Sequence, residues 1–227
     1  MATAKSTLQN PERLPILAIE TSGGLCSVAL LLAPGDIVET KIMMKHIHSE
    51  KLFPVIDSIL NLCSLKLELV REIAVSAGPG SFTGLRIGMS AAKGLAMGLN
   101  IPITAVPTFE AMALQICTFI NHGEEFLIAN SVNREELYFM KFKKENDFYK
   151  IIEELELVKK EDFDQRKGDT NLLFGDFARK NSFLNFNAPD AEYVAKWSYI
   201  FGDNFLSLKY DYLEPNYLKK FIIKEKK

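Results

Sequence analysis

The sequence has few of the residues that cross-link a protein or anchor it in a membrane. Its three cysteines, Cys26, Cys63 and Cys117, share no close spacing, so neither a disulfide framework nor a C-x-x-C motif is predicted. We expect reduced, buried thiols. No run approaches the roughly 18 apolar residues of a membrane-spanning helix, and the N-terminus lacks the apolar segment of a signal peptide. These absences predict a soluble, cytoplasmic protein without a membrane partner.

An excess of charge and a metal-binding motif are also lacking. The chain carries 27 Lys and Arg against 29 Asp and Glu, a formal net charge of −2. This balance gives no basic face for direct nucleic-acid binding. The only histidines, His46, His48 and His122, do not form an H-E-x-x-H motif. We therefore predict no metal site and no cofactor.

What the sequence does contain is an alternation of apolar runs and amphipathic segments. Strands are predicted at 15–20, 25–33, 36–44, 72–77, 101–105, 125–131, 135–142 and 148–155, and helices at 49–63, 82–98, 107–121 and 190–200. The first half thus reads β-β-β-α-β-α-β-α, which favours a mixed sheet with helices on both faces. A second set of three strands indicates an internal duplication, and the polar segment 161–170 is predicted to be a loop.

This order of elements matches the ribonuclease H-like core of actin, sugar kinases and Hsp70. The predicted fold is α/β, a two-lobed ribonuclease H-like/actin-like (ASKHA) fold with mixed β-sheets flanked by helices and a smaller, degenerate second lobe. We expect a flexible N-terminus at 1–14, a first ribonuclease H-like lobe at 15–122, and a second, smaller lobe with a C-terminal tail at 123–227.

The glycine-rich stretch SAGPGSFTGLRIGMSAAKGLAMG, residues 76–98, raises the possibility of a phosphate-binding loop. A Walker A loop needs G-x-x-x-x-G-K-[ST], but here Gly78 and Gly84 are six apart and Leu85-Arg86 follows. A dinucleotide fingerprint needs G-x-G-x-x-G, and the last spacing is one residue too long. Neither template fits, although a helix N-terminus still offers N–H groups to an anion.

The same stretch also predicts a helix with small residues along it. One i, i+4 row is Gly84, Gly88, Ala92 and Ala96, and a neighbouring row is Ser90, Gly94 and Gly98. Each interior glycine costs about 1 kcal/mol relative to alanine, so close packing must offset the loss. Two alternatives remain open: the small residues pack on the protein's own sheet, or they meet a helix of another subunit.

Residue sets for several chemistries are missing. A ribonuclease H-type nuclease needs carboxylates at several strand ends, but after Glu20 the fourth strand ends in Ser76-Ala77-Gly78. No base and orienting group are specified for a nucleophilic cysteine. The second-lobe turn 131–134 has neither glycine nor acid, so an intact two-lobe ATP clamp is not predicted.

Several segments together resemble the TsaB (YeaZ) family. They are LAIETSGGLCSVAL, HSEKLFPVID, AVSAGPGSFTGLRIGMSAAKGLAMGLNIPITAV and the late YLEPNY, with GPGSFTGLRIG at 78–88 the most specific. The second-lobe motif around Arg134, Glu136 and Tyr138 departs from the family pattern, because Asn130 and Glu135 stand where Asp and Gly are usual.

The resemblance implies a subunit without catalytic activity of its own. Such a subunit pairs with a TsaD transferase and is joined by TsaE, an ATPase, in the threonylcarbamoyladenosine modification of tRNA; it also forms homodimers. The partner interface implied for this chain consists of Leu52, Phe53, Ile56, Ser81, Phe82, Gly84, Leu85, Arg86, Gly88, Met89, Ala92, Lys93 and Ala96. Two alternatives are an ATP-dependent kinase or ATPase of the same superfamily and a glycoprotease-like peptidase.

Overall fold

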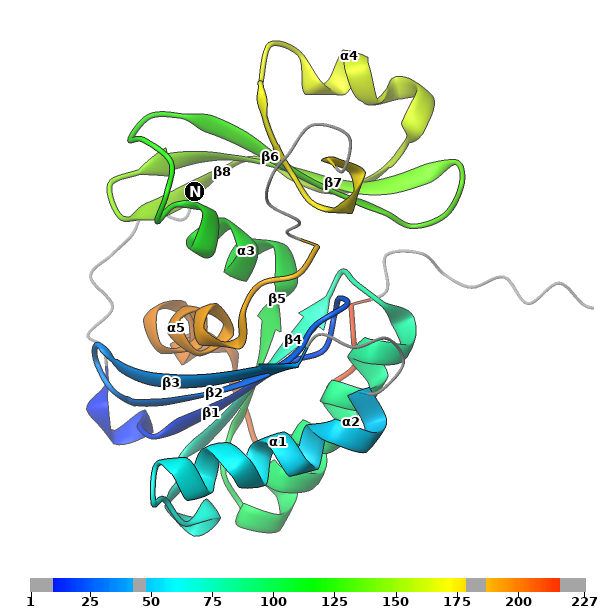
Figure 1. Ribbon diagram of the computed structural model, residues 1–227. Coiled ribbons are helices and arrows are strands. Elements are labelled where there is room, and N and C mark those ends of the chain that lie inside the picture. Colours follow the sequence, from blue (N-terminus) through cyan, green and yellow to red (C-terminus); the bar gives the residue numbers. More distant parts are fainter. Residues whose placement is uncertain (1–9, 43–47, 179–186, 217–227) are drawn as a thin grey trace, which may run out of the picture.

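Two mixed β-sheets with helices between and outside them make up the computed structural model, which describes residues 10–42, 48–178 and 187–216 (Figure 1). The first sheet has the strand order β10-β5-β4-β1-β2-β3. Its strands are β1 (Ile16–Glu20), β2 (Cys26–Ala33), β3 (Asp36–Ile42), β4 (Glu72–Gly78), β5 (Ile103–Pro107) and β10 (Leu206–Ser207). The first three form the predicted antiparallel meander, and β4 and β5 continue the sheet parallel to β1.

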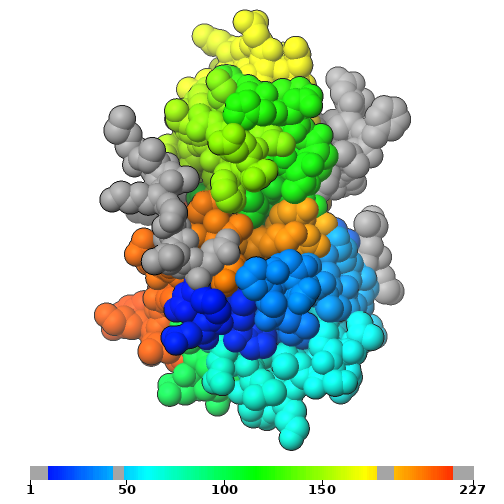
Figure 2. Space-filling model, turned by 90° about the vertical axis from the view of Figure 1, so that its left-hand side faces the viewer, coloured from blue at the N-terminus to red at the C-terminus, as the bar shows by residue number. Residues whose placement is uncertain are grey.

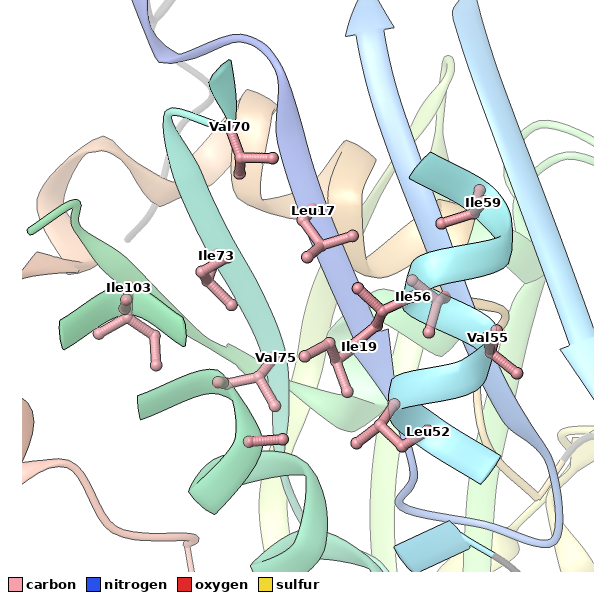
Figure 3. Packing of buried hydrophobic residues seen from close by; sticks show 14 of the residues in the cluster. Leu17, Ile19, Leu52, Val55, Ile56, Ile59, Val70, Ile73, Val75 and Ile103 are labelled. Atoms are coloured by element: carbon pink, nitrogen blue, oxygen red, sulfur yellow. The ribbon is translucent and has the colours of Figure 1, made fainter. Parts of the chain in front are cut away.

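Helices cover both faces of this sheet, as the alternation of elements predicted. One face carries α1 (His48–Leu62) and α2 (Phe82–Leu99), and the other carries α3 (Thr108–Ile116) and α5 (Ala191–Phe201). Strand β1 is apolar at consecutive positions because both of its faces are covered. Leu17 and Ile19 point toward α1 and α2, where Figure 3 shows Ile19 close to Leu52 and Ile56.

The second sheet repeats the pattern of the first with fewer elements. Its order is β8-β7-β6-β9, with β6 (Glu125–Ser131), β7 (Glu136–Glu145), β8 (Phe148–Lys159) and β9 (Leu172–Phe174). Again three antiparallel strands are followed by a strand parallel to the first. This repeat agrees with an internal duplication. The predicted α/β fold with two mixed sheets flanked by helices is confirmed.

Helix α3 lies between the two sheets (Figure 1). Its Phe109, Met112 and Ile116 pack with Phe126 and Phe142 of the second sheet in one buried cluster. The helix ends at Ile116 rather than at the predicted residue 121. One further difference concerns the predicted loop 161–170, which contains the short helix α4 (Phe163–Lys167), because Phe163 packs against Phe139 on the face of the second sheet that points away from α3 (Figure 1).

The segment after residue 190 lies on the first sheet, although the sequence analysis assigned it to the second lobe. Val194 and Trp197 of α5 are buried against β1, β2 and β4, and β10 pairs with β5. Figure 2 shows this orange segment between the green second lobe and the blue first strands. The reason is the apolar face of α5, which together with α3 covers this side of the first sheet.

The N-terminus differs from the expected flexible segment 1–14 where the structure describes it. Residues Pro11–Arg13 form a 3-10 helix, and the Arg13 side chain is buried. Its guanidinium donates to the Glu72 carboxylate at 2.8 Å and also contacts Asp203. Glu72 further accepts from Thr104 at 2.8 Å and from Ser198. These hydrogen bonds compensate the cost of burying the charges and tie the N-terminus to α5.

Candidate partner-binding face and inter-lobe cavity

The inner row of α2, consisting of Gly84, Gly88, Ala92 and Ala96, faces the chain's own sheet. All four residues are buried. A Cβ placed on Gly84 would lie 2.0 Å from the Thr21 carbonyl oxygen, and one on Gly88 would lie 2.3 Å from Thr21 Oγ1. In turn Thr21 Oγ1 donates a hydrogen bond of 2.8 Å to the Gly84 carbonyl. For this row the first of the two alternatives holds: glycine lets α2 approach the turn after β1.

The outer row of α2, consisting of Ser90, Gly94 and Gly98, faces away from the sheet. All three residues are exposed, and a Cβ on Gly94 or Gly98 would meet no atom within 4 Å. Beside them Met97 is 57% exposed, a large apolar side chain without cover. Internal packing therefore does not account for the glycines of this row, and their cost in helix stability remains without an offset inside the chain.

A groove of about 420 Å³ runs between α1 and the outer side of α2. Its lining residues are Ser49, Leu52, Phe53, Arg86, Ile87, Ser90 and Ala91. On the α1 side Phe53 is 50% exposed. At the α2 side the Arg86 guanidinium lies 3.9 Å from the centroid of the Phe82 ring. An apolar groove with aromatic and arginine side chains at its border has the composition of a protein interface.

The structure divides the predicted interface residues into two groups. Leu52, Ile56, Gly84, Leu85, Gly88, Met89, Ala92 and Ala96 are buried in the first lobe. Phe53, Ser81 and Arg86 are exposed, and Phe82 and Lys93 are partly exposed. The buried group holds the two helices on the sheet, and a direct contact of these side chains with a partner would require the lobe to open.

The predicted interface set left out the outward-facing residues Ile87, Ser90, Gly94 and Met97, although the sequence already showed Ser90 and Gly94 in a row of small residues. The available signal was the i, i+3/i+4 spacing of Arg86, Ser90, Lys93 and Met97, in which polar and apolar residues mix. The predicted interface instead followed the inner row, because all of its residues are glycine or alanine. Small residues of α2 face the sheet on one side and lie exposed on the other, and only the three-dimensional arrangement tells the two rows apart.

A second cavity, also of about 420 Å³, lies between the two lobes. Its lining residues are Ser22, Gly23, Gly80, Ser81, Phe82, Asn130, Ser131, Val132, Asn133, Tyr138, Asp176 and Asn187. The turn after β1 and the first turn of α2 form one wall, and the turn after β6 forms the other. Among these lining residues Asp176 is the only one with a charged side chain, so the described wall offers no cation to a polyphosphate.

Glu20 ends β1 behind this cavity and is fully buried. Its carboxylate accepts hydrogen bonds from Ser76 Oγ and from the Ser22 backbone N–H. Burial raises its pKa to about 7, an effect that these hydrogen bonds partly oppose and the nearby Asp190 reinforces. The Ser22 hydroxyl also lies beside this carboxylate and helps to lower its pKa. It is not aligned for a hydrogen bond with any described group.

The cysteines and the described histidine contacts have surroundings typical of residues with a structural role. Burial raises the pKa of the Cys26 thiol to about 11 and that of Cys117 to about 12, which makes both poor nucleophiles at neutral pH. His122 Nδ1 accepts from the Asn146 N–H at 2.9 Å, and His46 lies outside the described residues. Within the described ranges no three His, Cys, Asp or Glu side chains gather as a metal site, and no helix is long and apolar enough to cross a membrane.

Comparison with known sequences relates the chain to tRNA modification proteins. The sequence model of the family described as TsaD, tRNA N6-adenosine threonylcarbamoyltransferase, matches residues 41–200. The chain is 33% identical over 150 residues to the tRNA threonylcarbamoyladenosine biosynthesis protein TsaB of Haemophilus influenzae, a match that covers 65% of this chain and 63% of that protein. It is 42% identical over 100 residues to TsaB of Bacillus subtilis, covering 44% of each. The matched segments thus span less than two thirds of these relatives.

Comparison with solved structures concerns the fold alone. YeaZ of Pseudomonas aeruginosa superimposes with a TM-score of 0.73 at 22% identity, covering 89% of this chain and 99% of that one. A second structure from the same organism, of a protein described as similar to peptidase YeaZ, gives a TM-score of 0.75 at 23% identity, covering 90% and 99%.

Fold and site together define a two-lobed α/β protein of the actin-like type, with an open helical face on its first lobe and a cavity between its lobes. The family match extends over more than half of the chain. The chain belongs to the family described by the TsaD model and, within it, to the TsaB (YeaZ) group.

Proposed function

We propose that this chain is a subunit of the machinery that makes threonylcarbamoyladenosine in tRNA, and that it pairs with a TsaD-like transferase through α1 and α2. The names of its relatives support the pathway. The observation that carries the pairing is the open outer row of α2 beside the apolar groove. A TsaE-like ATPase joins this pair. The tRNA binds to the complex as a whole, and the complex is cytoplasmic.

The match to the transferase family supports a two-helix interface on both partners. Because the family model covers α1, α2 and α3 of this chain, a TsaD-like partner has a first lobe of the same design. Two similar helical faces can pack around a pseudo-twofold axis, with the helices of each lobe in the groove of the other. The same geometry permits a homodimer, which would compete with the heterodimer for one surface.

We further propose that the chain is non-catalytic and acts by supporting its partner. No lysine, arginine, histidine or cysteine is among the described residues that line the inter-lobe cavity, and burial holds Cys26 and Cys117 as thiols. A kinase or ATPase is not favoured, because no described lysine or arginine lines the cavity. A metallopeptidase is not favoured, because no described cluster offers three metal ligands.

The test is the substitution Gly94→Leu on the outer row. A Cβ there meets no atom of the chain within 4 Å, and the position is exposed, so folding is expected to be unchanged, while the leucine side chain fills the space into which a partner helix would pack. We expect the affinity for the TsaD-like partner to fall at least about 100-fold, equivalent to about 2.7 kcal/mol. Titration calorimetry of the two purified subunits measures this loss directly.

A matched control separates the interface from a general effect of added leucine. Glu154→Leu places the same side chain on an exposed position of β8, far from the groove, and should leave pairing unchanged. Equal affinity of the Gly94→Leu variant and the wild-type chain would refute the proposed interface. A second measurement tests the pathway itself: tRNA modification by the reconstituted subunits should stop when this chain is omitted.

A further inference from the structure

The segment 187–190, which we call the strap, passes between the two lobes immediately before α5 (Figure 1). Toward the second lobe, the Asn187 carbonyl oxygen accepts a hydrogen bond of 2.9 Å from Asn130 Nδ2, near the end of β6. Toward the first lobe, Ala188 is buried against the turn after β1, where a Cβ on Gly23 would lie 2.5 Å from the Ala188 Cβ. The strap therefore contacts both lobes beside the inter-lobe cavity, which Asn187 also lines.

Asp190 holds the end of the strap between two elements. Gln115 of α3 donates from Nε2 to Asp190 Oδ2 at 2.7 Å, and Gln115 Oε1 accepts from the Asp190 N–H at 3.0 Å. The same Oδ2 lies 2.6 Å from Lys41 Nζ of β3. Because α3 packs with the second sheet and β3 belongs to the first, this carboxylate joins the two lobes. These bonds are only partly buried, so water can replace them when the strap moves.

A second connection between the lobes consists mainly of aromatic side chains. The Tyr149 hydroxyl of β8 donates to Glu110 Oε2 of α3 at 2.7 Å and accepts from Trp197 Nε1 of α5 at 2.7 Å. The Tyr149 ring also contacts the rings of Phe142 and Phe201, with centroid distances of 5.4 and 5.9 Å. Water does not replace aromatic packing of this kind, so this connection is firmer than the strap.

From the two connections we propose that the strap is a latch and that the contact around Tyr149 is a pivot. When the strap is released, the lobes rotate about Tyr149, the inter-lobe cavity widens and the turn after β1 loses its cover. Segments held by a few partly exposed hydrogen bonds open more readily than packed aromatic clusters, so the strap opens first. This inference is independent of the proposed function, because α1 and α2 lie on the opposite face of the first sheet.

Two neighbouring glycines of the turn after β1 provide a matched pair of variants. In Gly23→Ala the new Cβ would overlap the Ala188 side chain, so the strap must move. In Gly24→Ala the nearest listed contact of the new Cβ, to Asn187 Nδ2, is an ordinary one of 3.9 Å. We therefore expect Gly23→Ala to release the strap and Gly24→Ala to leave it in place.

A second pair of variants separates the latch from the pivot. Gln115→Leu releases the strap from the α3 side, while Asp190 keeps Lys41 as its ion-pair partner. Tyr149→Phe removes the hydrogen bonds of the pivot and leaves the contacts of the strap intact. It should lower the melting temperature without releasing the strap. Gly23→Ala and Gln115→Leu are thus the two releasing variants, and they act from opposite lobes.

Hydrogen exchange of the Ala191 N–H measures the opening of the strap in the full-length chain. This N–H directly follows the strap and donates to Ser27 Oγ of β2 at 3.1 Å, a bond that none of the variants removes. Its exchange is compared with that of the slowest strand amides, which report global unfolding. In the two releasing variants it should be at least about tenfold faster, the factor for one lost hydrogen bond to a charged group. The two control variants should show no such acceleration.

Distances between two spin labels show whether the lobes rotate. One label replaces Ser58 on α1, and the other replaces Lys159, which lies about 33 Å along β8 from Tyr149 and so moves far in a rotation. Cys63, the partly exposed native cysteine, is replaced by serine. Wild type and Gly24→Ala should give one distance, and the releasing variants should add a second.

Thermal unfolding checks that each variant is folded. Unchanged exchange in both releasing variants, equal acceleration in Gly24→Ala, or faster exchange with a single unchanged distance would overturn the inference.

Discussion

The two rows of small residues on α2 look alike in the sequence and differ completely in their surroundings. The inner row contacts the turn after β1 so closely that Gly84 and Gly88 leave no room for a methyl group. The outer row has open space above Gly94 and Gly98. The small residues of this one helix thus have two different physical roles. On the inside it is required for the lobe to close, and on the outside it leaves a flat surface that another helix can approach.

The largest expected difference between the rows comes from placing valine on each. In Gly84→Val the new Cβ would overlap the Thr21 carbonyl oxygen, a backbone atom that cannot rotate away. We expect the free energy of unfolding to fall by about 3 kcal/mol or more, at the upper end of the range for overpacking. Gly98→Val, the matched change on the outer row, should alter it by less than about 0.5 kcal/mol. Urea unfolding of both variants measures the contrast, and similar losses would contradict the assignment of the rows.

The pH dependence of stability tests whether Glu20, which precedes the turn contacted by the inner row, is buried. Its pKa is about 7 in the folded chain against 4.5 as the ordinary value, so the folded state binds more protons between these values. Stability should therefore fall as pH rises from 4.5 to about 7, by roughly 3 kcal/mol in total. The buried carboxylate is neutral below this window and carries its full desolvation cost above it.

Glu20→Gln removes this titration while it retains an amide oxygen as acceptor. The difference in unfolding free energy between variant and wild type should grow in favour of the variant by about 3 kcal/mol from pH 4.5 to pH 8. Other groups with raised pKa, including Glu39 and Glu110, titrate in both proteins and cancel in the comparison. Parallel stability curves for the two proteins would show that Glu20 is solvated.

Alanine substitutions at Gly88 and Gly94 have the smallest expected effects on stability, and the two effects are opposite in sign. Gly88→Ala should destabilise the chain by about 1–2 kcal/mol, because its Cβ would press on Thr21 Oγ1 and the hydrogen bond from this atom to Gly84. Gly94→Ala should stabilise it by up to about 1 kcal/mol, because alanine is the better helix former and nothing obstructs it. Thermal unfolding distinguishes the two. A loss of stability in Gly94→Ala would mean that this position is packed.

Local sequence patterns predicted most of the elements because their signals are short in range. The apolar run in β1, the spacing of Leu52, Ile56 and Ile59 in α1, and Ser81 at the start of α2 each specify an element within a few residues. The candidate site was harder to predict. Its prediction needed the orientation of α2 about its own axis, which depends on Thr21, a residue more than sixty positions away along the chain from Gly84.

The course of the chain after residue 190 is a second case of long-range control. The amphipathic pattern of α5 predicted a helix, yet nothing near it in the sequence indicates which sheet its apolar face will cover. The answer depends on an uncovered face formed by β1, β2 and β4 and on Ser198, which donates to Glu72 across the fold. The buried pair of Arg13 and Glu72 was not predictable for the same reason, since two charged residues far apart in the sequence form no local pattern.

By itself the sequence determined the α/β class, the two meanders and the helices between them, because hydrophobic periodicity and capping act over one or two turns of chain. Its motif 78–88 also pointed to the family to which the chain belongs. Only the tertiary structure decided which small residues of α2 face inward, where α5 packs, and that the turns after β1 and β6 meet at the inter-lobe cavity. Those outcomes depend on contacts between segments distant in the chain, where close packing leaves a single arrangement that satisfies both volume and hydrogen bonding.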